Sequence, residues 1–313
     1  NKDSKNSYFE DFKNLNKKTN IEKIFHLISN FSKTSEIRYV GGSIRKIINR
    51  EVVDDIDLAT TISPLEVCEI LKKNNISFYE SGIKHGTVTA KIEEYKFEIT
   101  TLRKDISTDG RHAEVEFSKD WHEDASRRDF TFNAIYADLH GNLYDPFNGR
   151  EDLELGNVKF IGDPEKRIKE DYLRILRYVR FFLNYSKVDH NANLKKIIKQ
   201  NINGISKISS DRLLDELKKL VLSGGFLKIV KDEFCQEIVG LIFPQLINLN
   251  VFKNINDYSK EIIEKKDFIF MVSLMIIDET DNSEYFIYKY NISNVDKKRI
   301  RFLSNIFSNN LDK

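Results

Sequence analysis

The sequence predicts an α+β protein whose first half mixes helices with strands and whose remainder is helical. Short apolar segments with the alternation of strands occur only up to about residue 157. From about Asp163 onward these segments vanish, and apolar residues recur at helical spacing. The helical pattern is clearest in three segments, residues 165–184, 209–223 and 258–279.

The elements of the first half follow one another closely, and their apolar patterns give their positions. Ser63-Pro64 supplies the N-cap and first-turn proline of a helix start. Glu93-Glu94 separates two alternating segments and predicts a hairpin turn. In chain order we expect a helix at 21–31, a strand at 37–40, a helix at 43–49, a strand at 54–59, a helix from residue 64, and strands at 87–92 and 95–101.

Composition indicates a globular protein long enough for two or three domains. The 313 residues are 40% hydrophobic and 32% charged. No apolar stretch approaches the roughly 18–20 residues of a membrane span, so no membrane partner is expected. The two cysteines, Cys68 and Cys235, lie far apart and show no metal-binding spacing. We therefore expect a cytosolic protein without disulfides. The net charge of +1 gives no indication of a nucleic-acid partner.

The first group of residues with chemical potential surrounds a pair of glycines. Gly41-Gly42 ends a predicted strand and opens a helix, an arrangement that lets backbone N–H groups approach a phosphate. Arg45, one turn into that helix, is placed to bind triphosphate oxygens. Asp55 and Asp57 alternate on the next predicted strand, so both carboxylates point to one face. Two convergent carboxylates are suited to a pair of magnesium ions.

Glu98, between two apolar residues of a later strand, is a candidate third carboxylate. Each of these features has an ordinary explanation. A glycine pair usually marks a turn, an Asp-x-Asp motif is usually surface acid, and a strand glutamate can simply face solvent. The order and spacing of the whole set favour the metal site.

At this point the motifs resemble the class II, bacterial-type tRNA nucleotidyltransferases, the CCA-adding enzymes of the DNA polymerase β superfamily. The resemblance covers roughly residues 38–220 and is nearest to the alphaproteobacterial branch. It implies a polymerase-β-like head followed by a helical neck and body. The matching segments are Val40 to Arg45, Asp55 to Thr60, Gly82 to Val88, Thr100 to Arg103, Thr108 to His112, Arg127 to Thr131 with Asn133-Ala134, and Glu170 to Arg180.

The resemblance implies that Arg127, Arg128 and Asp129 hold the phosphates and ribose of the incoming nucleotide. Forked guanidinium donors suit phosphate, and a carboxylate accepts from ribose hydroxyls. The sequence leaves open which arginine faces the nucleotide. Taken alone, the three residues would indicate a surface cluster of ion pairs.

The resemblance also assigns base selection to one predicted helix. Spacings of three and four from either Glu170 or Asp171 through the arginines place these side chains along one stripe, which alone would indicate intrahelical ion pairs. The residues are Glu170, Asp171, Arg174, Arg177 and Arg180. In this family the E-D-x-x-R pattern acts as a protein template. Asp171 accepts from the amine of cytosine or adenine, and Arg174 donates to the ring acceptors. Uracil would leave polar groups unpaired, at roughly 1–3 kcal/mol each. Arg177 and Arg180 are expected to help with triphosphate or with positioning the template.

Residues 103–115 correspond to the flexible loop that assists the switch from cytosine to adenine in this family. Its expected members are Arg103, Asp105, Asp109, Gly110 and Arg111. Their presence argues against an enzyme limited to two cytosines. His85 and His112 are expected to be structural. The family usually has an acidic residue where this chain has Lys46, so the partner of that residue must differ.

Together these features predict magnesium-dependent addition of CMP and AMP, from CTP and ATP, to the 3′ acceptor end of tRNA. We expect a catalytic head at 1–157, a neck with the base-selection helix at 158–222, and a body with a reduced tail at 223–313. Alternatives are a poly(A) polymerase, an enzyme restricted to CC or A, and a non-catalytic RNA-binding relative. Oligomeric state is not predicted. Lysines that could bind tRNA are Lys195, Lys196, Lys199, Lys218 and Lys219.

Overall fold

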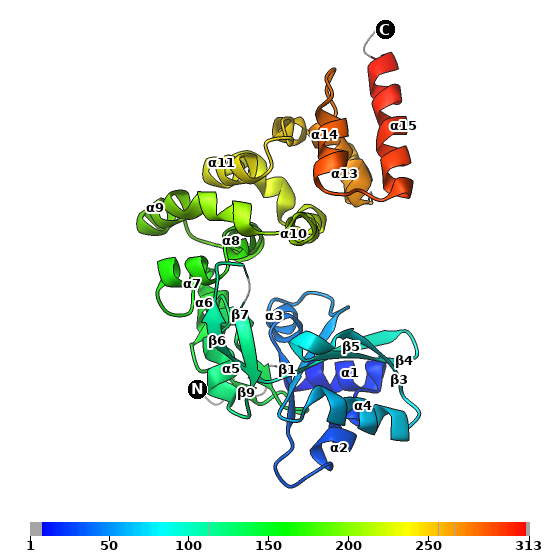
Figure 1. Ribbon diagram of the computed structural model, residues 1–313, viewed down its shortest axis with the longest axis vertical. Helices are drawn as coiled ribbons and strands as arrows, with labels where there is room; N and C mark the ends of the chain where they lie inside the picture. The colour runs from blue at the N-terminus through cyan, green and yellow to red at the C-terminus, as the bar shows by residue number, and fades with distance from the viewer. Residues whose placement is uncertain (1–7, 112, 256, 266, 311–313) are drawn as a thin grey trace. The chain divides into compact units, whose positions relative to one another are not determined.

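The computed structural model describes residues 8–310, apart from residues 112, 256 and 266. The chain forms two units, one of residues 1–108 and 113–163 and the other of residues 109–112 and 164–313. Every named strand of the described residues lies in the first unit, and the second unit is built from helices (Figure 1). The prediction of an α+β chain with a helical second part is therefore confirmed.

A seven-stranded sheet organises the first unit, in the order β3-β4-β5-β2-β1-β8-β9. Only the β2–β5 pair is parallel, and its register sets Asp57 opposite Glu98. The hairpin turn predicted at Glu93-Glu94 joins β4 to β5, with Glu93 at φ 54°. The strands are β1 (Ile37–Val40), β2 (Ile56–Thr60), β3 (Ser77–Gly82), β4 (Thr87–Ile92), β5 (Tyr95–Thr101), β8 (Tyr136–Ala137) and β9 (Leu143–Tyr144).

Helices pack around this sheet, and one begins as the sequence predicts. At the start of α4, Ser63 Oγ accepts from Glu66 N at 3.3 Å and Glu66 Oε2 accepts from Ser63 N at 2.9 Å. This reciprocal capping box satisfies two backbone donors that a helix start would otherwise leave unpaired. The helices of the unit are α1 (Phe9–Thr19), α2 (Glu22–Ser29), α3 (Gly42–Ile48), α4 (Pro64–Lys73), α5 (Trp121–Ser126) and α6 (Gly149–Leu155), with 3₁₀ turns at Ile83–His85 and Thr131–Asn133.

The segment predicted as a flexible loop forms a hairpin instead. Strands β6 (Arg103–Thr108) and β7 (Ala113–Phe117) pair in an antiparallel two-stranded sheet. The residues between them, 109–112, group with the second unit. His112 lies outside the described residues.

The second unit consists of α-helices and short 3₁₀ turns. Helix α10 reproduces the prediction for 209–223 closely, whereas the segment predicted at 258–279 is divided into α12 and α13. Its α-helices are α7 (Pro164–Glu170), α8 (Leu173–Tyr185), α9 (Ala192–Asn201), α10 (Ser210–Leu222), α11 (Glu233–Ile242), α12 (Asp257–Glu264), α13 (Phe268–Ile276), α14 (Asn282–Lys289) and α15 (Asn294–Asn310), with 3₁₀ turns at Ile202–Lys207, Phe226–Lys231 and Leu249–Phe252.

The prediction of one helix over 165–184 is wrong, because the helical structure is interrupted between α7 and α8. The backbone N–H of Tyr172 donates to the carbonyl of Gly110 at 3.0 Å rather than to a helical carbonyl. Asp171 forms an isolated bridge with Gly110, and its Oδ1 accepts from Leu173 N at 3.2 Å at the start of α8. The hydrogen bond of Tyr172 to Gly110 and the contact of Asp171 with Leu173 N together separate α7 from α8.

None of the helices in the described part of the chain has the length and apolarity needed to cross a bilayer.

Candidate active site

Two carboxylates meet on the neighbouring parallel strands β2 and β5. Asp57 lies opposite Glu98 in the register and shares a hydrogen bond with it. Burial raises the pKa of Asp57, while the contact with Glu98 and the charges of Arg128 and Arg45 oppose that rise. Two carboxyl groups held this close together offer the oxygen ligands that a divalent cation prefers.

Asp55 lies just outside the strand in which we expected it. Strand β2 begins at Ile56, and Asp55 is exposed in the bend before it. Its charge still raises the pKa of Asp57, although less than burial does. The ligand atoms of Asp55, Asp57 and Glu98 do not all lie within 4.8 Å of one another. Among the described residues, a different group of three does so.

The glycine pair fits closely against these groups. A Cβ on Gly42 would lie 3.1 Å from Asp57 Oδ2, and Gly41 adopts a φ of 58°. A larger residue at either position would crowd the carboxylate or strain the turn. The two glycines therefore allow α3 to begin directly beside Asp57.

Arg45 and Asp129, both predicted to bind the nucleotide, belong to one buried chain of contacts. Arg45 Nη1 donates to Asn133 Oδ1, and Asn133 Nδ2 donates to Asp129 Oδ1 at 2.9 Å. Asp129 Oδ1 also accepts from Phe130 N at 2.7 Å. The structure thus joins α3 to the segment after α5 through side chains that the sequence analysis had treated separately.

Arg128 is anchored by two residues that the sequence analysis did not identify. Its Nε and Nη2 donate to Asp124 Oδ2 at 3.3 and 3.2 Å, and Tyr136 Oη donates to the same oxygen at 2.5 Å. Asp124 is 2% exposed. Asp124 lies four residues before Arg128, a helical spacing that would have been the signal for this ion pair.

Arg103 and Arg127 extend this basic cluster. Arg127 Nε donates to Asp105 Oδ1 at 2.7 Å, and Arg103 Nη1 donates to the carbonyl of His85 at 2.6 Å. Burial, followed by repulsion from Arg127 and Arg128, lowers the pKa of Arg103 to about 10. A bound anion would relieve that repulsion, so the electrostatics of the cluster suit phosphate.

Lys46, the departure from the family pattern, has a partner close by. Its Nζ donates to Asp54 Oδ1 at 2.5 Å. Burial alone would raise the pKa of Asp54, but the hydrogen bond and charge of Lys46 lower it. Asp54, the residue before Asp55, is thus held by a side chain of α3.

In the second unit, Asp171 is paired with Arg212, which the sequence analysis missed. Arg212 Nη2 donates to Asp171 Oδ2 at 2.8 Å and Nη1 donates to Oδ1 at 3.2 Å. Arg212 Nη1 also donates to the carbonyl of Arg111 at 2.6 Å. Arg212 therefore fixes both Asp171 and the residues that link β6 to β7.

The other residues of the predicted stripe form two further ion-pair groups. Arg174 Nη1 donates to Glu170 Oε2 at 3.0 Å, and Arg180 Nε donates to Glu216 Oε1 at 2.5 Å. Arg177 lies 3.9 Å from the second oxygen of Glu216, which is 2% exposed. Glu216 was also missed, although it follows Arg212 by four residues on α10.

The link between β6 and β7 contains the remaining predicted residues. Arg111 Nε contacts Asp109 Oδ2 at 3.3 Å. Gly110 adopts a φ of 88°, and a Cβ there would lie 2.8 Å from the ring of Tyr172. Glycine is therefore needed for the close approach to Tyr172.

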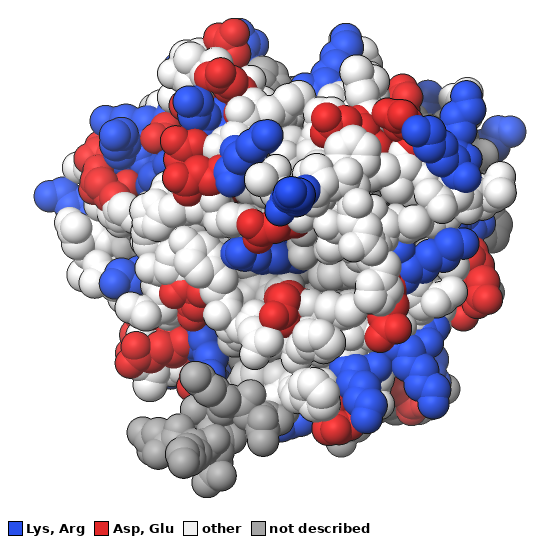
Figure 2. Space-filling view, turned by 90° about the horizontal axis from the view of Figure 1, so that it is seen from below, with Lys and Arg blue, Asp and Glu red and all other residues white. Residues whose placement is uncertain are grey.

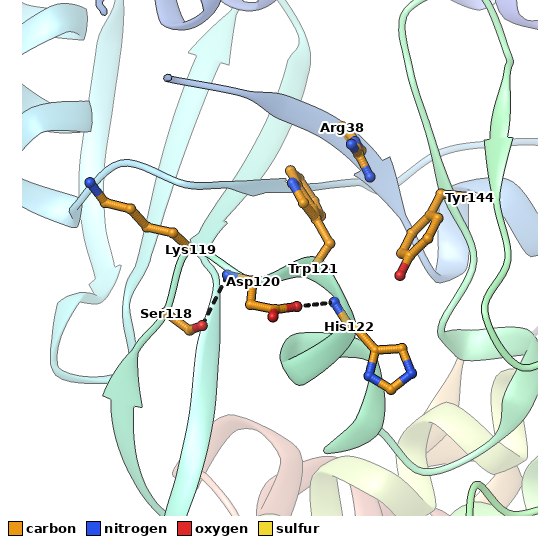
Figure 3. Close-up of a pocket in the computed structure, with 7 residues that line it drawn as sticks. All are labelled: Arg38, Ser118, Lys119, Asp120, Trp121, His122 and Tyr144. Carbon is orange, nitrogen blue, oxygen red and sulfur yellow. Dashed lines mark hydrogen bonds between the residues drawn. The ribbon is translucent and has the colours of Figure 1, made fainter. Parts of the chain in front are cut away.

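A separate open pocket of about 650 Å³ lies in the first unit. Figure 3 shows its aromatic wall, in which the Arg38 guanidinium lies 4.0 Å from the Trp121 ring centroid and 5.4 Å from that of Tyr144. The lining residues are Arg38, Ser118, Lys119, Asp120, Trp121, His122 and Tyr144. None of them is a predicted site residue.

On the face in Figure 2, basic and acidic side chains lie among one another, with neutral areas between them. This pattern agrees with the 50 basic and 49 acidic residues of the chain.

Comparisons with known proteins agree with the motifs. Residues 37–159 match the poly A polymerase head domain. The human mitochondrial CCA tRNA nucleotidyltransferase 1 is 41% identical over 237 residues, which cover 72% of this chain and 54% of that protein. The CCA-adding enzyme of Lactobacillus helveticus (strain DPC 4571) is 40% identical over 187 residues, or 59% of this chain and 46% of that enzyme.

A solved structure shares the fold. The Bacillus stearothermophilus CCA-adding enzyme in complex with CTP superposes with a TM-score of 0.67 at 24% identity, over 92% of this chain and 70% of that one. The chain spans about half the length of the curated relatives it matches. Residues 37–159 therefore match the head domain of the poly A polymerases, and the chain is similar over 59–72% of its length to proteins named as CCA-adding enzymes or CCA tRNA nucleotidyltransferases.

Proposed function

We propose that this protein adds CMP and AMP, from CTP and ATP, to the 3′ end of tRNA and releases pyrophosphate. The observation that carries the proposal is a carboxylate pair beside a basic cluster, within a head domain whose curated relatives are named for CCA addition. The reacting groups would be the tRNA 3′-hydroxyl and the α-phosphate of the nucleotide.

Asp55 and Asp57 would hold magnesium, with Glu98 as a further oxygen ligand. Their oxygen donors fit a hard divalent cation, and the register that sets Asp57 opposite Glu98 would let both side chains reach one ion. When bound, magnesium supplies charge stabilisation to the phosphate oxygens and acidifies the attacking hydroxyl. The glycines at 41 and 42 keep this carboxylate edge open.

The arginine cluster would bind the triphosphate. Burial, followed by repulsion from Arg127 and Arg128, lowers the pKa of Arg103 to about 10, so a bound polyanion would stabilise all three guanidinium groups. Arg45 and Asp129, joined through Asn133, would position the sugar and phosphates.

Asp171 and Arg174 would select the base. The carboxylate of Asp171 accepts from Leu173 N and twice from Arg212, and an ionised carboxylate has about four acceptor positions. Oδ2 therefore retains capacity for the exocyclic amine of cytosine or adenine. Arg212 holds the direction of that carboxylate, and Glu170 does the same for the Arg174 guanidinium.

The remaining parts complete the proposal. We assign residues 1–157 to the catalytic head, 158–222 to the neck and 223–313 to a body that binds tRNA. Asp109, Gly110 and Arg111 would assist the change from cytosine to adenine. Arg177 and Arg180, which both contact Glu216 on α10, would help with triphosphate or with positioning the template.

An extension assay tests this activity. The full chain is incubated with magnesium, tRNA that ends at the discriminator base, and labelled CTP, ATP or both. We expect three added nucleotides only when both substrates are present. Long homopolymer from ATP alone would identify a poly(A) polymerase, and addition of two cytosines or one adenine only would identify a restricted enzyme. Binding without extension would identify a non-catalytic RNA-binding protein.

The metal assignment is tested by Asp55→Ala, with Asp54→Ala as the matched control. Asp55→Ala should abolish incorporation while tRNA binding stays nearly unchanged, because the carboxylate acts on the reacting groups and not on the RNA. Asp54 pairs with Lys46, so Asp54→Ala should retain most of the activity. Equal activity of Asp55→Ala and the parent would refute the assignment.

A further inference from the structure

Three residues with different metal-binding atoms meet in the second unit, away from the predicted site residues. His190 precedes α9, Asp232 is the N-cap of α11, and Cys235 lies in the first turn of α11. One ligand atom of each lies within 4.8 Å of the others, and this is the single such group of three among the described residues. The sequence gives no local signal for this group, because His190 lies 42 and 45 residues before Asp232 and Cys235.

The distances are close to those between the ligand atoms of a metal site. His190 Nε2 lies 2.8 Å from Asp232 Oδ2 and 3.7 Å from Cys235 Sγ. Zinc bonds of about 2.3 Å to sulfur and 2.0–2.1 Å to nitrogen and oxygen place tetrahedral ligands roughly 3.3–3.6 Å apart. Shifts of about half an ångström or less would bring both of these pairs to that spacing, and all three ligand atoms already lie within 4.8 Å of one another.

The surroundings support His190 as a ligand. Tyr178 Oη lies 2.8 Å from His190 Nδ1, and the hydroxyl oxygen can accept a hydrogen bond from Nδ1–H once Nε2 binds a metal. The Phe182 ring stacks on the imidazole with centroids 3.5 Å apart, and Phe234 meets its edge at 4.8 Å. These contacts fix the orientation of the imidazole before any metal binds.

Charge and access also suit a divalent ion. Cys235 is fully buried, while the side chains of His190 and Asp232 are 11% and 16% exposed, which leaves an entry on one side. A neutral imidazole, a carboxylate and a thiolate together carry two negative charges, which a divalent cation neutralises. Asp232 can bind through Oδ2 because Oδ1 accepts the helix N–H of Cys235 at 2.9 Å.

We propose that His190, Asp232 and Cys235 form a structural zinc site that joins α11 to the segment before α9. Zinc prefers this mixture of nitrogen, oxygen and sulfur, whereas magnesium prefers oxygen alone. Binding would release the thiol proton of Cys235 to solvent, the N–H proton of His190 would shift from Nε2 to Nδ1, where it is donated to Tyr178 Oη, and water would complete the fourth position. The ion would stabilise the second unit without taking part in nucleotide transfer.

The test uses the full chain in saturating magnesium, so that the carboxylates of the first unit are occupied. The protein is loaded with cobalt(II), whose bond to a thiolate gives an intense near-ultraviolet absorption that oxygen ligands do not produce. We expect this absorption, its loss on adding zinc, and about one zinc ion retained per chain after desalting. A parent protein that shows no such absorption and retains no zinc would overturn the proposal and leave a purely hydrogen-bonded Tyr-His-Asp cluster.

The two cysteines provide a matched pair of variants. Cys235→Ser should lose the absorption, whereas Cys68→Ser should keep it, because Cys68 lies in α4 of the first unit. Tyr178→Phe should keep the absorption and weaken zinc binding by about tenfold, since it removes the partner of Nδ1. If Cys235→Ser does not fold, the spectra of the parent and of Cys68→Ser still decide. The result is independent of nucleotide addition, so either proposal can fail without the other.

Discussion

Asp124 connects the basic cluster of the first unit to its core. It is almost fully buried, and it accepts from Arg128, Tyr136 and the backbone of Arg103. Burial alone would raise the pKa of Asp124, but Arg128 and the Tyr136 hydroxyl together lower it. The ionised form is therefore preferred in the folded state more strongly than in the unfolded chain.

This preference makes the stability of the first unit sensitive to acid. Asp124 contributes stabilisation that is complete above the ordinary carboxyl pKa of 3.8 and is lost as the pH falls through its lower folded-state pKa. We expect Asp124→Asn to reduce the free energy of unfolding by about 2 kcal/mol at pH 7 and by much less at pH 2. Urea unfolding at both pH values measures the difference.

Glu116→Gln is the control for this experiment. Glu116 is exposed on β7, and its carboxylate lies 3.7 Å from Lys104, so its removal should change stability little at either pH. A loss for Asp124→Asn that is the same at pH 7 and pH 2 would contradict the electrostatic explanation.

At the scale of elements, the break between α7 and α8 sets the position of Asp171. The break places Asp171 where Arg212 can hold both of its oxygens. The base-selection role proposed for Asp171 therefore depends on the segment that replaces the helical hydrogen bond.

Replacing Asp171 by Ala should blur base choice more than it weakens phosphate binding. The acceptor for the exocyclic amine disappears, while the arginine cluster of the first unit is unchanged. We expect the preference for CTP over UTP in kcat/KM to fall by about 10- to 100-fold, the loss of one or two polar contacts. An unchanged preference would refute the template role. Asp215→Ala, an exposed change on α10, is the control.

Several elements could be predicted from the sequence because their signals are local. The strands around Val40 and Ile99 show apolar alternation, and Ser63-Pro64 caps a helix through its own neighbours. Strand β3 was missed because most of its residues are exposed and carry no alternation. The break at Asp171 and its pairing with Arg212 depend on residues distant in the chain, which no local pattern reveals.

The candidate site shows the same division. Asp57 and Glu98 could be identified as acids on strands, and the register now sets them opposite each other. Asp124, Tyr136 and Arg212 were missed, because their importance comes from partners brought together by the fold. A motif identifies the residues that take part in the reaction. It gives less indication of the residues that hold those side chains in position.

At the scale of the whole molecule, the proposed binding of tRNA would have to arise from local patches of positive charge. The formal net charge is only +1, so attraction to a polyanion depends on where lysines gather. Helix α9 contains such a place, where Lys195, Lys196 and Lys199 line one shallow hollow with Ala192 and Gln200. Lys199 is paired with Glu237 at 2.9 Å. The hollow is a candidate contact for tRNA phosphates.

The double change Lys195→Ala and Lys196→Ala should weaken tRNA binding and its salt dependence together. Each lysine that contacts a phosphate contributes about one unit to the slope of log K against log salt, so the slope should fall by about 2. Binding is measured by filter retention across a salt series. Lys72→Ala with Lys73→Ala on α4 is the control pair and should leave the slope as it is. An equal effect of both pairs would contradict a specific patch.

The hydrogen bond between Tyr172 and Gly110 makes one amide proton a reporter. Since the acceptor of that proton is a carbonyl of another segment, deuterium can replace the proton only when that segment separates from the helix junction. Its exchange rate in the free protein, set against the rates of amides within α8, gives the free energy of that separation. Slower exchange in the presence of CTP or ATP would show that nucleotide keeps the two segments joined.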